Sequence, residues 1–201
     1  MSELKQEFGD SVILLTFHVD YWDSLGWKDT FSDPRWTERQ KMYGQAFSQS
    51  SIYTPEMVID GDVGFNGADG RRAQDEVSSR LSTRKGSLDL ALIAKSAKSI
   101  ELSIHLTPEL AKLAKELLAV IVEDDSPVYV RRGENRGETM SGDFAVRAMR
   151  SVSVGSGGQA HVVLALPSGV DPARSRVAIL VRGESPKIIS AQSIPWLTSA
   201  K

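Results

Sequence analysis

Residues 11–33 of the sequence read SVILLTFHVDYWDSLGWKDTFSD. The first part, Ser11 to Val19, is a short and almost continuous apolar run that is rich in residues favouring strands. Such runs usually become strands that are buried on both faces of a sheet. The polar and aromatic stretch from Asp20 to Ser32 follows directly, which predicts a loop after that strand. Because open α/β sheets bind ligands in the loops at the carboxyl ends of their strands, a site is expected here.

The segments around this run complete an α/β pattern. Ser2 to Phe8 is typical of the last turns of a helix, which Gly9 is expected to stop. Asp33 and Pro34 predict a helix start, with a carboxylate at the N-cap and proline at the first helical position. The remaining elements expected in this half are strands over Met57–Asp60 and Val63–Phe65 and a helix over Ala68–Thr83.

From Gly86 onward the pattern changes to short strands separated by turn signals, which is typical of an antiparallel sandwich. One or two helical turns are expected over 108–116. Lys85-Gly86-Ser87 is the predicted boundary, so residues 1–86 form an α/β domain and residues 87–201 an all-β domain. The expected strands are 88–94, 100–106, 117–123, 128–132, 144–154, 161–166, 176–182 and 187–194.

Composition excludes several classes of protein. The chain has 201 residues, a formal net charge of −2 and no cysteine. This charge balance argues against a nucleic acid or an anionic membrane as partner, and no apolar run is long enough to span a membrane. Without cysteine the chain has no thiolate nucleophile and no thiolate metal site. We therefore expect no thiol–disulfide activity and no cofactor.

Ten of the 14 aromatic residues fall between Phe17 and Phe65, so a site is expected in the first half. His18 and Asp20 are two residues apart at a strand end, with Asp23 and Asp29 within reach of the loop. This group could bind a divalent metal or act as a general base. Alternatively, His18 is a buried histidine with its hydrogen bonds satisfied, and the aspartates cap turns. One histidine without a second nitrogen or sulfur ligand favours the alternative, so no metal is predicted.

Trp22 and Trp27 could form an aromatic platform for a ligand or a peptide, but packing of the loop onto its own domain is the simpler and favoured explanation. Thr54 and Pro55 directly precede the strand at Met57. By statistics alone the peptide bond before Pro55 is expected to be trans.

The string HVDYWDSLGWKDTFSDPRWTERQKMYGQAF at residues 18–47, followed by IYTPEMVIDG at 52–61, resembles a bacterial thioredoxin-like family, domain-of-unknown-function family 1223, often described as secreted protein. Two later landmarks, RGENRG at 132–137 and FAVR at 144–147, extend the resemblance over nearly the whole chain. The resemblance implies that Thr54-Pro55 is the cis-proline loop that faces the redox motif of thioredoxins. It therefore reverses the statistical expectation of a trans bond.

Two departures from the family follow from the same comparison. The chain starts inside the first helix, so the first strand and the CxxC-type motif are missing, and Phe144 stands where many members have asparagine. The missing strand would lie between Ser11–Val19 and Met57–Asp60. Its absence leaves unpaired backbone groups, which predicts self-association through the incomplete sheet. Alternatively, the gap is filled by a segment of another chain, by rearranged pairing within this one, or by a sequence upstream of Met1.

The resemblance leaves two functions open. The chain as given is expected to be a non-catalytic binding or interaction module for a protein or peptide. The alternative is a thiol–disulfide redox protein whose cysteines lie upstream of Met1; a metal-assisted hydrolase built on His18 is a third, weaker reading. Met1–Asp10 lacks the zones of a signal peptide, so a cytoplasmic product is expected, or a periplasmic or secreted one if the true start lies upstream. The candidate site residues are His18, Asp20, Trp22, Asp23, Trp27, Thr54 and Pro55.

Overall fold

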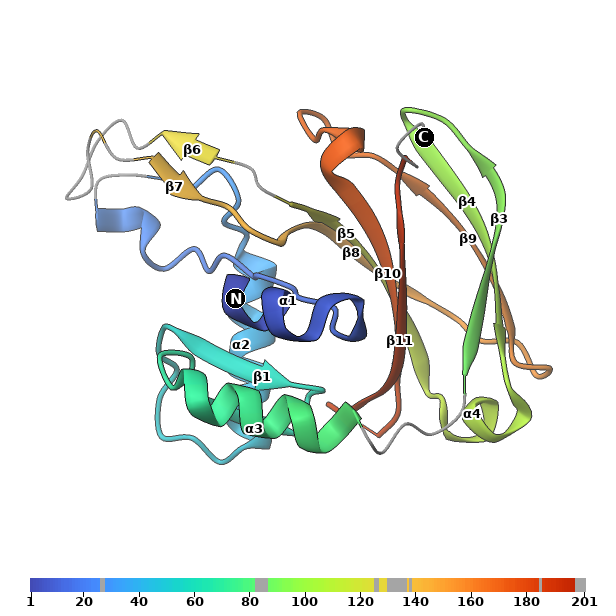
Figure 1. Ribbon diagram of the computed structural model, residues 1–201, viewed down its shortest axis with the longest axis horizontal. Helices are drawn as coiled ribbons and strands as arrows, with labels where there is room; N and C mark the ends of the chain where they lie inside the picture. The colour runs from blue at the N-terminus through green and yellow to red at the C-terminus, as the bar shows by residue number, and fades with distance from the viewer. Residues whose placement is uncertain are drawn as a thin grey trace.

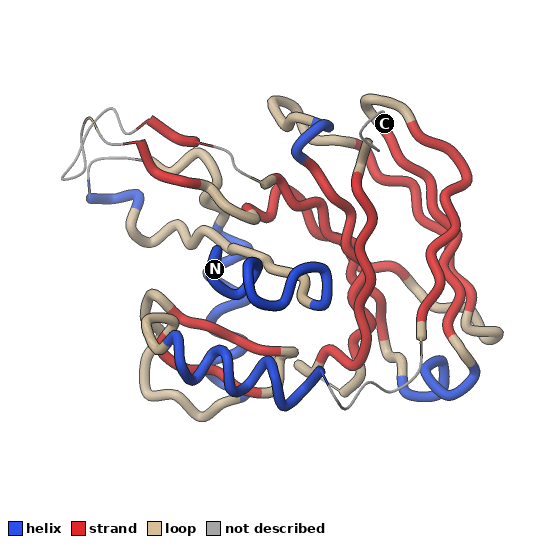
Figure 2. The backbone as a smooth tube through the Cα atoms, in the orientation of Figure 1, coloured by secondary structure: helices blue, strands red, loops and turns tan. Residues whose placement is uncertain are grey.

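The computed structural model describes residues 1–25, 28–81, 87–124, 127–129, 137, 139–184 and 186–197, and for 127–129 and 139–141 it describes the backbone alone. The chain has a mixed α/β structure. Its longer helices lie in the first half, and antiparallel sheets occupy the second half (Figures 1 and 2). Across the described residues, none of the helices combines the length and the apolar character that crossing a bilayer requires.

The helices and the hairpin of the first half form where the sequence predicts them. Helix α1 ends at Gly9, whose φ of 55° continues the chain in the left-handed region. Helix α2 begins after Asp33, whose carboxylate accepts a hydrogen bond from the Arg35 N–H at 2.8 Å. Strands β1 and β2 pair in antiparallel register. The bounds are α1 Ser2–Phe8, α2 Pro34–Ala46, β1 Glu56–Ile59, β2 Val63–Asn66 and α3 Gly70–Leu81.

The strand predicted over Ser11–Val19 is wrong, because only one residue of the run is paired as in a sheet. Gly9–Ser11 form a 3₁₀ turn. The N–H of Thr16 then donates to the Phe144 carbonyl at 2.8 Å, and the Thr16 carbonyl accepts from the Val146 N–H at 3.0 Å. These bonds make a single parallel bridge, and residues 12–19 are half-buried rather than fully buried.

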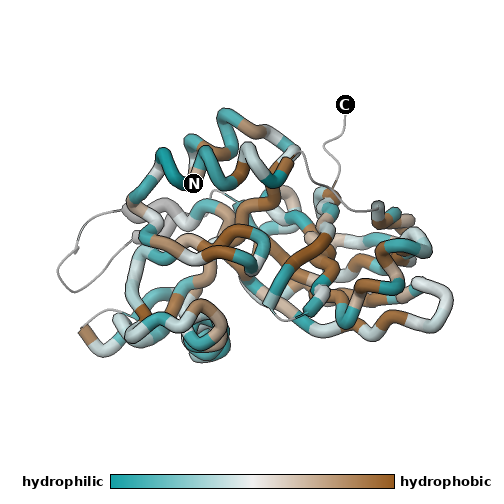
Figure 3. Tube along the Cα trace, turned by 90° about the horizontal axis from the view of Figure 1, so that it is seen from below, coloured by the Kyte–Doolittle hydropathy of each residue, from teal (hydrophilic) through white to brown (hydrophobic). Residues whose placement is uncertain are grey.

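Alternate side chains of this extended segment enter two different apolar clusters. Those of 13, 15 and 17 pack against one face of the four-stranded sheet, in a group called here the sheet-side cluster (Trp36, Leu118, Val120, Val122, Val146, Ala178 and Leu180). Those of 12 and 14 pack against the helix-side cluster (Leu4, Phe65, Ala73 and Val77). In Figure 3 the apolar stretches of the trace gather toward the middle of the molecule. The run is therefore shared between two cores instead of being enclosed by one sheet.

The second half contains a four-stranded sheet of order β11-β10-β5-β8, a three-stranded sheet of order β3-β4-β9 and the hairpin β6-β7, all with antiparallel pairing. The predicted strands are confirmed to within a few residues, whereas β7 has no predicted counterpart. Part of the strand predicted over 128–132 lies outside the described residues. The bounds are β3 Leu88–Lys95, β4 Ser99–Leu106, α4 Pro108–Leu113, β5 Glu116–Glu123, β6 Pro127–Tyr129, β7 Thr139–Ser141, β8 Ala145–Val152, β9 Gln159–Ala165, β10 Ser175–Arg182 and β11 Ile188–Pro195.

The four-stranded sheet is apolar on both faces. One face packs against the three-stranded sheet in an inter-sheet cluster that includes Leu102, Ile104, Leu117, Ile179 and Trp196. The opposite face belongs to the sheet-side cluster, into which α2 contributes its tryptophan. Residues from the predicted units 1–86 and 87–201 therefore share one apolar cluster. The boundary predicted at 85–87 stays a prediction, because residues 82–86 lie outside the described part of the chain.

The β1–β2 turn of the first half also contacts the β10–β11 turn of the second half. The N–H of Ile188 donates to the Asp60 carbonyl at 2.7 Å. Next to this bond, the Asp62 carboxylate pairs with Lys187 at 2.5 Å and with Arg80 at 3.2 Å. These ion pairs are partly exposed, so each contributes little stability. The backbone bond fixes where the two turns meet.

Candidate functional site

The candidate loop, residues 18–33, is closed at its base by contacts of its first residue. The His18 carbonyl accepts from the Asp33 N–H at 3.2 Å. His18 Nδ1 lies 2.6 Å from the Asp29 carboxylate, whose other oxygen accepts from the Phe31 N–H at 2.9 Å. The first and last residues of the loop therefore lie side by side, next to the N-terminus of α2.

The His18–Asp29 pair is half-buried, with about 20% of each side chain exposed. Burial alone would raise the pKa of Asp29. The hydrogen bonds from His18 and from the Phe31 N–H, with the charges of His18 and Arg147, outweigh burial and hold this pKa below its usual value. His18 Nε2 is buried and has no hydrogen-bond partner. Among the predicted site residues that the structure describes, His18 thus carries the one buried side-chain polar atom without a hydrogen-bond partner.

Aromatic and cationic contacts connect this pair to the four-stranded sheet. The Phe31 ring meets the His18 ring edge-on at 5.2 Å between centroids. The Arg147 guanidinium lies 4.5 Å from the centroid of the same phenyl ring and donates to the Glu123 carboxylate at 2.8 Å. The base of the loop is therefore fixed against β8 and β5.

Of the three loop aspartates, Asp29 bonds to His18, whereas Asp20 and Asp23 bond elsewhere. Asp20 accepts a hydrogen bond from the Thr37 hydroxyl at 2.5 Å, and its own N–H donates to that hydroxyl at 3.2 Å. Asp23 accepts from the Ser32 hydroxyl at 2.6 Å and from the Asp29 N–H at 3.2 Å. Within the described residues, no three His, Asp or Glu side chains gather as a metal site would need. Both aspartates instead bond to groups of the loop and of helix α2.

The structure brings Trp22, Thr54 and Pro55 together from segments that are far apart in the sequence. The indole N–H of Trp22 donates to the Thr54 hydroxyl at 3.1 Å. The peptide bond between Thr54 and Pro55 is cis, as the family resemblance predicts. Trp22 is 52% exposed, and both residues of the proline loop are exposed as well. Trp27, the other predicted tryptophan, lies outside the described residues.

A buried polar network that the sequence analysis missed supports this surface. Gln40 of α2 is only 8% exposed and accepts from the Tyr21 hydroxyl at 3.1 Å. Its amide NH₂ donates to the Tyr53 carbonyl at 2.6 Å and to the Glu56 carboxylate at 3.0 Å. Gln49 donates to the same carboxylate at 2.8 Å. The signal in the sequence is a glutamine four residues after Trp36, on the apolar face of the predicted helix.

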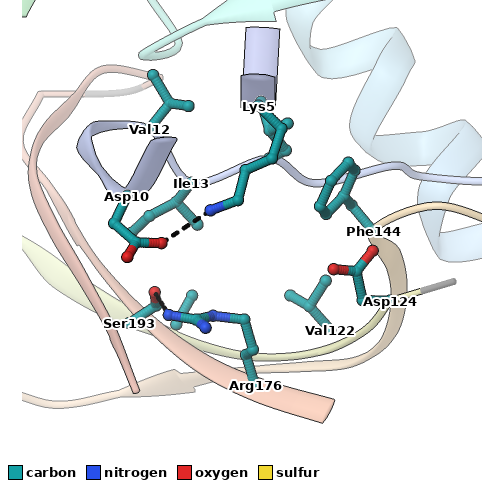
Figure 4. A pocket seen from close by; sticks show the side chains of 11 residues that line it. Lys5, Asp10, Val12, Ile13, Val122, Asp124, Phe144, Arg176 and Ser193 are labelled. Carbon is teal, nitrogen blue, oxygen red and sulfur yellow. Dashed lines mark hydrogen bonds and ion pairs between the residues drawn. The ribbon is translucent and has the colours of Figure 1, made fainter. Parts of the chain in front are cut away.

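One cavity, of about 60 Å³, lies between the N-terminal segment and the four-stranded sheet (Figure 4). Its charged groups are largely paired: Lys5 lies 2.8 Å from Asp10, and Arg176 donates to the Ser193 hydroxyl at 3.1 Å. The hydrogen bond from Lys5 and the charges of Lys5 and Arg176 lower the pKa of Asp10. None of the predicted site residues that the structure describes lines this cavity, so the described part of the candidate site is separate from the cavity.

Asp29 carries a prediction about acid stability. Because its pKa is lowered in the folded state, its contribution to stability is present above the unfolded-state pKa of about 3.9 and is lost as the pH falls through the lower folded value. Asp29→Asn keeps the shape and removes the charge, so we expect it to cost roughly 1 to 3 kcal/mol at pH 7. Urea unfolding between pH 7 and pH 2.5 measures this. The free energy of unfolding of the variant should also fall less between pH 7 and pH 2.5 than that of the wild type. An equal fall in both proteins would contradict the assignment.

Comparisons with known proteins give a family and a fold. The family described as "Protein of unknown function (DUF1223)" matches residues 1–182. The structure is similar to the crystal structure of a protein from Agrobacterium tumefaciens with a TM-score of 0.64 and 22% sequence identity, and the match covers 93% of this chain and 82% of that chain. At this identity the similarity shows the fold alone. None of the curated proteins matches the chain.

Proposed function

Because the chain belongs to the DUF1223 family, described as proteins of unknown function, we propose its function from its geometry: it is a non-catalytic interaction module that binds a segment of a partner protein or a peptide. The observation that carries this proposal is Trp22. More than half of this large aromatic side chain is exposed, yet its indole N–H is fixed on Thr54. Exposed tryptophans that are held in one orientation are typical anchors of protein interfaces.

The proposal includes the fold assignment. Residues 1–86 are a thioredoxin-like domain, which the order helix, extended segment, helix, hairpin and helix supports. Residues 87–201 are a β-sandwich, which two antiparallel sheets sharing one apolar cluster support. In this arrangement the candidate loop and the proline loop lie next to each other on the first domain.

The buried network around Gln40 makes the proposed surface rigid. It joins the candidate loop, through Tyr21, to the segment around the proline loop, through Tyr53 and Glu56. Tyr21 also packs against Trp22, with 5.2 Å between ring centroids. A side chain that is already ordered loses less conformational entropy on binding than a mobile one. Trp22 is therefore prepared to act as an anchor before any partner arrives.

The test is a selection of 12-residue peptides from a random display library on the purified chain, followed by titration of the selected peptides. Trp22→Ala is expected to raise their dissociation constants about 30-fold, because the loss of an anchor costs about 2 kcal/mol. Leu25→Ala is the matched control, since Leu25 is 69% exposed in the same loop and is expected to change binding less than threefold. Selected peptides that bind Trp22→Ala as tightly as the wild type would contradict the proposal.

A further inference from the structure

Two arginines lie near each other between helix α2 and one end of the four-stranded sheet. Arg39 of α2 donates to the Tyr43 hydroxyl at 2.8 Å, and its guanidinium lies 5.0 Å from the ring centroids of Phe17 and Tyr43. Arg182, the last residue of β10, pairs with the Glu116 carboxylate at the start of β5. The Nε atom of each arginine is buried and has no hydrogen-bond partner among the described residues. Each arginine therefore carries an unused N–H donor that is shielded from water.

The hydroxyl of Tyr43 lies within the electrostatic reach of both arginines. Burial raises the pKa of Tyr43, and the positive charges of Arg39 and Arg182 partly offset this rise. Burial lowers the pKa of Arg39, and the like charge of Arg182 acts in the same direction. The Tyr43 oxygen accepts from Arg39, while no described group accepts the hydrogen of the hydroxyl. The cluster thus holds two N–H donors and one O–H donor without acceptors.

The carboxylates near this cluster already have other partners. Both oxygens of Glu116 are used, one by Arg182 and the other by the Ser151 hydroxyl. The carboxylate of Glu56, whose charge also reaches the tyrosine, accepts from two glutamine side-chain amides. In the described part of the chain, no Asp or Glu side chain forms an ion pair with Arg39. An acceptor for the three donors must therefore come from outside the described residues.

Charge and geometry specify the chemical class of this acceptor. The neighbouring charges of Arg182 and Glu116 balance each other, so the charge of Arg39 itself is uncompensated. A buried charge without an opposite partner is costly, which favours an acceptor with one negative charge. A guanidinium presents its N–H groups in a planar fork that matches the two oxygens of a carboxylate. A carboxylate therefore fits both the charge and the donors of the cluster.

We propose that Arg39, Tyr43 and Arg182 form a binding site for a carboxylate, which accepts hydrogen bonds from the two Nε–H groups and from the tyrosine hydroxyl. The side chain of Arg182 is 29% exposed and that of Glu116 is 22% exposed, so the cluster is open to solvent at its rim. The carboxylate belongs either to a small organic acid or to an acidic side chain of a partner protein. The site shares no residue with the Trp22 surface, and neither proposal depends on the other.

The test follows the ¹H–¹⁵N signals of the arginine Nε groups of the full chain while sodium acetate replaces sodium chloride at constant ionic strength. The signals of Arg39 and Arg182 are expected to shift together and to give the same half-saturation concentration. Arg35 is the internal control, because its Nε–H already donates to the Asp33 carboxylate at 2.9 Å and its signal should not shift.

A second titration identifies the source of the carboxylate. The acetylated and amidated peptide GGEGG carries one glutamate side chain and no other charge. Binding of this peptide at least tenfold tighter than that of acetate would support the site and assign it to an acidic side chain of a partner protein. Binding of acetate alone, or of both with similar affinity, would support the site and assign it to a small organic acid.

Two substitutions test the donors that the proposal names. Tyr43→Phe keeps the ring and removes only the hydroxyl, so it is expected to weaken acetate binding about tenfold, as the loss of one hydrogen bond to a charged group predicts. Arg39→Gln removes a charge as well as donors and is expected to weaken binding further. Arg71→Gln is the matched control, since Arg71 is exposed on α3, and it should leave binding unchanged. If Arg39→Gln does not fold, Tyr43→Phe and the wild-type signals decide.

Three outcomes would overturn the proposal. The first is that acetate shifts neither the Arg39 nor the Arg182 signal, which would mean that another group of the protein already accepts from them or that water alone does. The second is that Tyr43→Phe binds acetate as tightly as the wild type. The third is that the Arg35 signal shifts as much as the other two, which would show unspecific association of acetate with arginines.

Discussion

Gly61→Ala is expected to lower the free energy of unfolding by roughly 2 to 3 kcal/mol. Gly61 is buried in the β1–β2 turn at φ 62°, a conformation that other residues adopt only with strain. A Cβ added there would lie 2.2 Å from the carbonyl oxygen of Pro186 and 2.9 Å from its carbonyl carbon. Because both atoms belong to backbone, the β10–β11 turn must move, and the bond between Asp60 and Ile188 weakens with it. Urea denaturation of the purified variant measures the change.

Gly169→Ala is the matched control for this prediction. Gly169 also has a positive φ, of 80°, but an added Cβ would meet no atom within 4 Å. Only the cost of the left-handed conformation remains, and we expect about 1 kcal/mol. Equal losses in the two variants would show that strain, and not the contact with Pro186, governs Gly61.

Helices and strands whose ends are set by neighbouring cap or turn residues form where the sequence predicts them. The caps of α1 and α2 are set by Gly9 and Asp33, and the strands of the second half are bounded by turn residues that lie next to them. The run Ser11–Val19 shows the limit. Its pattern correctly predicts apolar surroundings on both faces. A strand also needs partners along its edges, and the residues of the run do not specify those partners.

The candidate site shows the same division between local and distant information. The sequence places several aromatic residues in the loop after the extended segment, of which the structure exposes Trp22, and the resemblance correctly predicts the cis bond before Pro55. The sequence does not predict that Trp22 bonds to Thr54, because the two residues are brought together only when α2, which lies between them in the chain, folds. Nor does it predict Gln40 as the residue that joins the two segments, since a lone polar residue on an apolar face has no partner visible in sequence.

Phe144 has a structural explanation that its residue type alone does not suggest. The resemblance places asparagine here in many family members. Its φ is 58°, in the left-handed region that asparagine tolerates better than bulky residues do. Its carbonyl accepts the Thr16 N–H, and its side chain packs against the sheet-side cluster. The backbone conformation at this position, rather than a polar side chain, supports the contact between β8 and the extended segment.

Trp36→Ala is expected to have the largest effect of any single change in α2, about 3 to 5 kcal/mol. Trp36 is 2% exposed and is the residue through which α2 enters the sheet-side cluster. Its ring meets Phe17 of the extended segment edge-on, with 5.1 Å between centroids. Truncation would remove contacts to the helix's two neighbours, the sheet and the extended segment, and would leave a cavity between them. Urea denaturation measures the loss of stability.

The positions of the amides whose hydrogen exchange becomes faster distinguish this prediction from a general loss of stability. Under native conditions, Trp36→Ala is expected to speed exchange in α2 and in residues 12–17 more than in β10. Trp196→Ala is the control, because Trp196 is also fully buried but lies in the inter-sheet cluster, with its indole N–H donating to the Ser96 carbonyl at 3.1 Å. That variant should loosen β3 and β4 first. If both variants loosen the same amides, the two clusters behave as one cooperative core, and the separate attachment of α2 to the sheet is wrong.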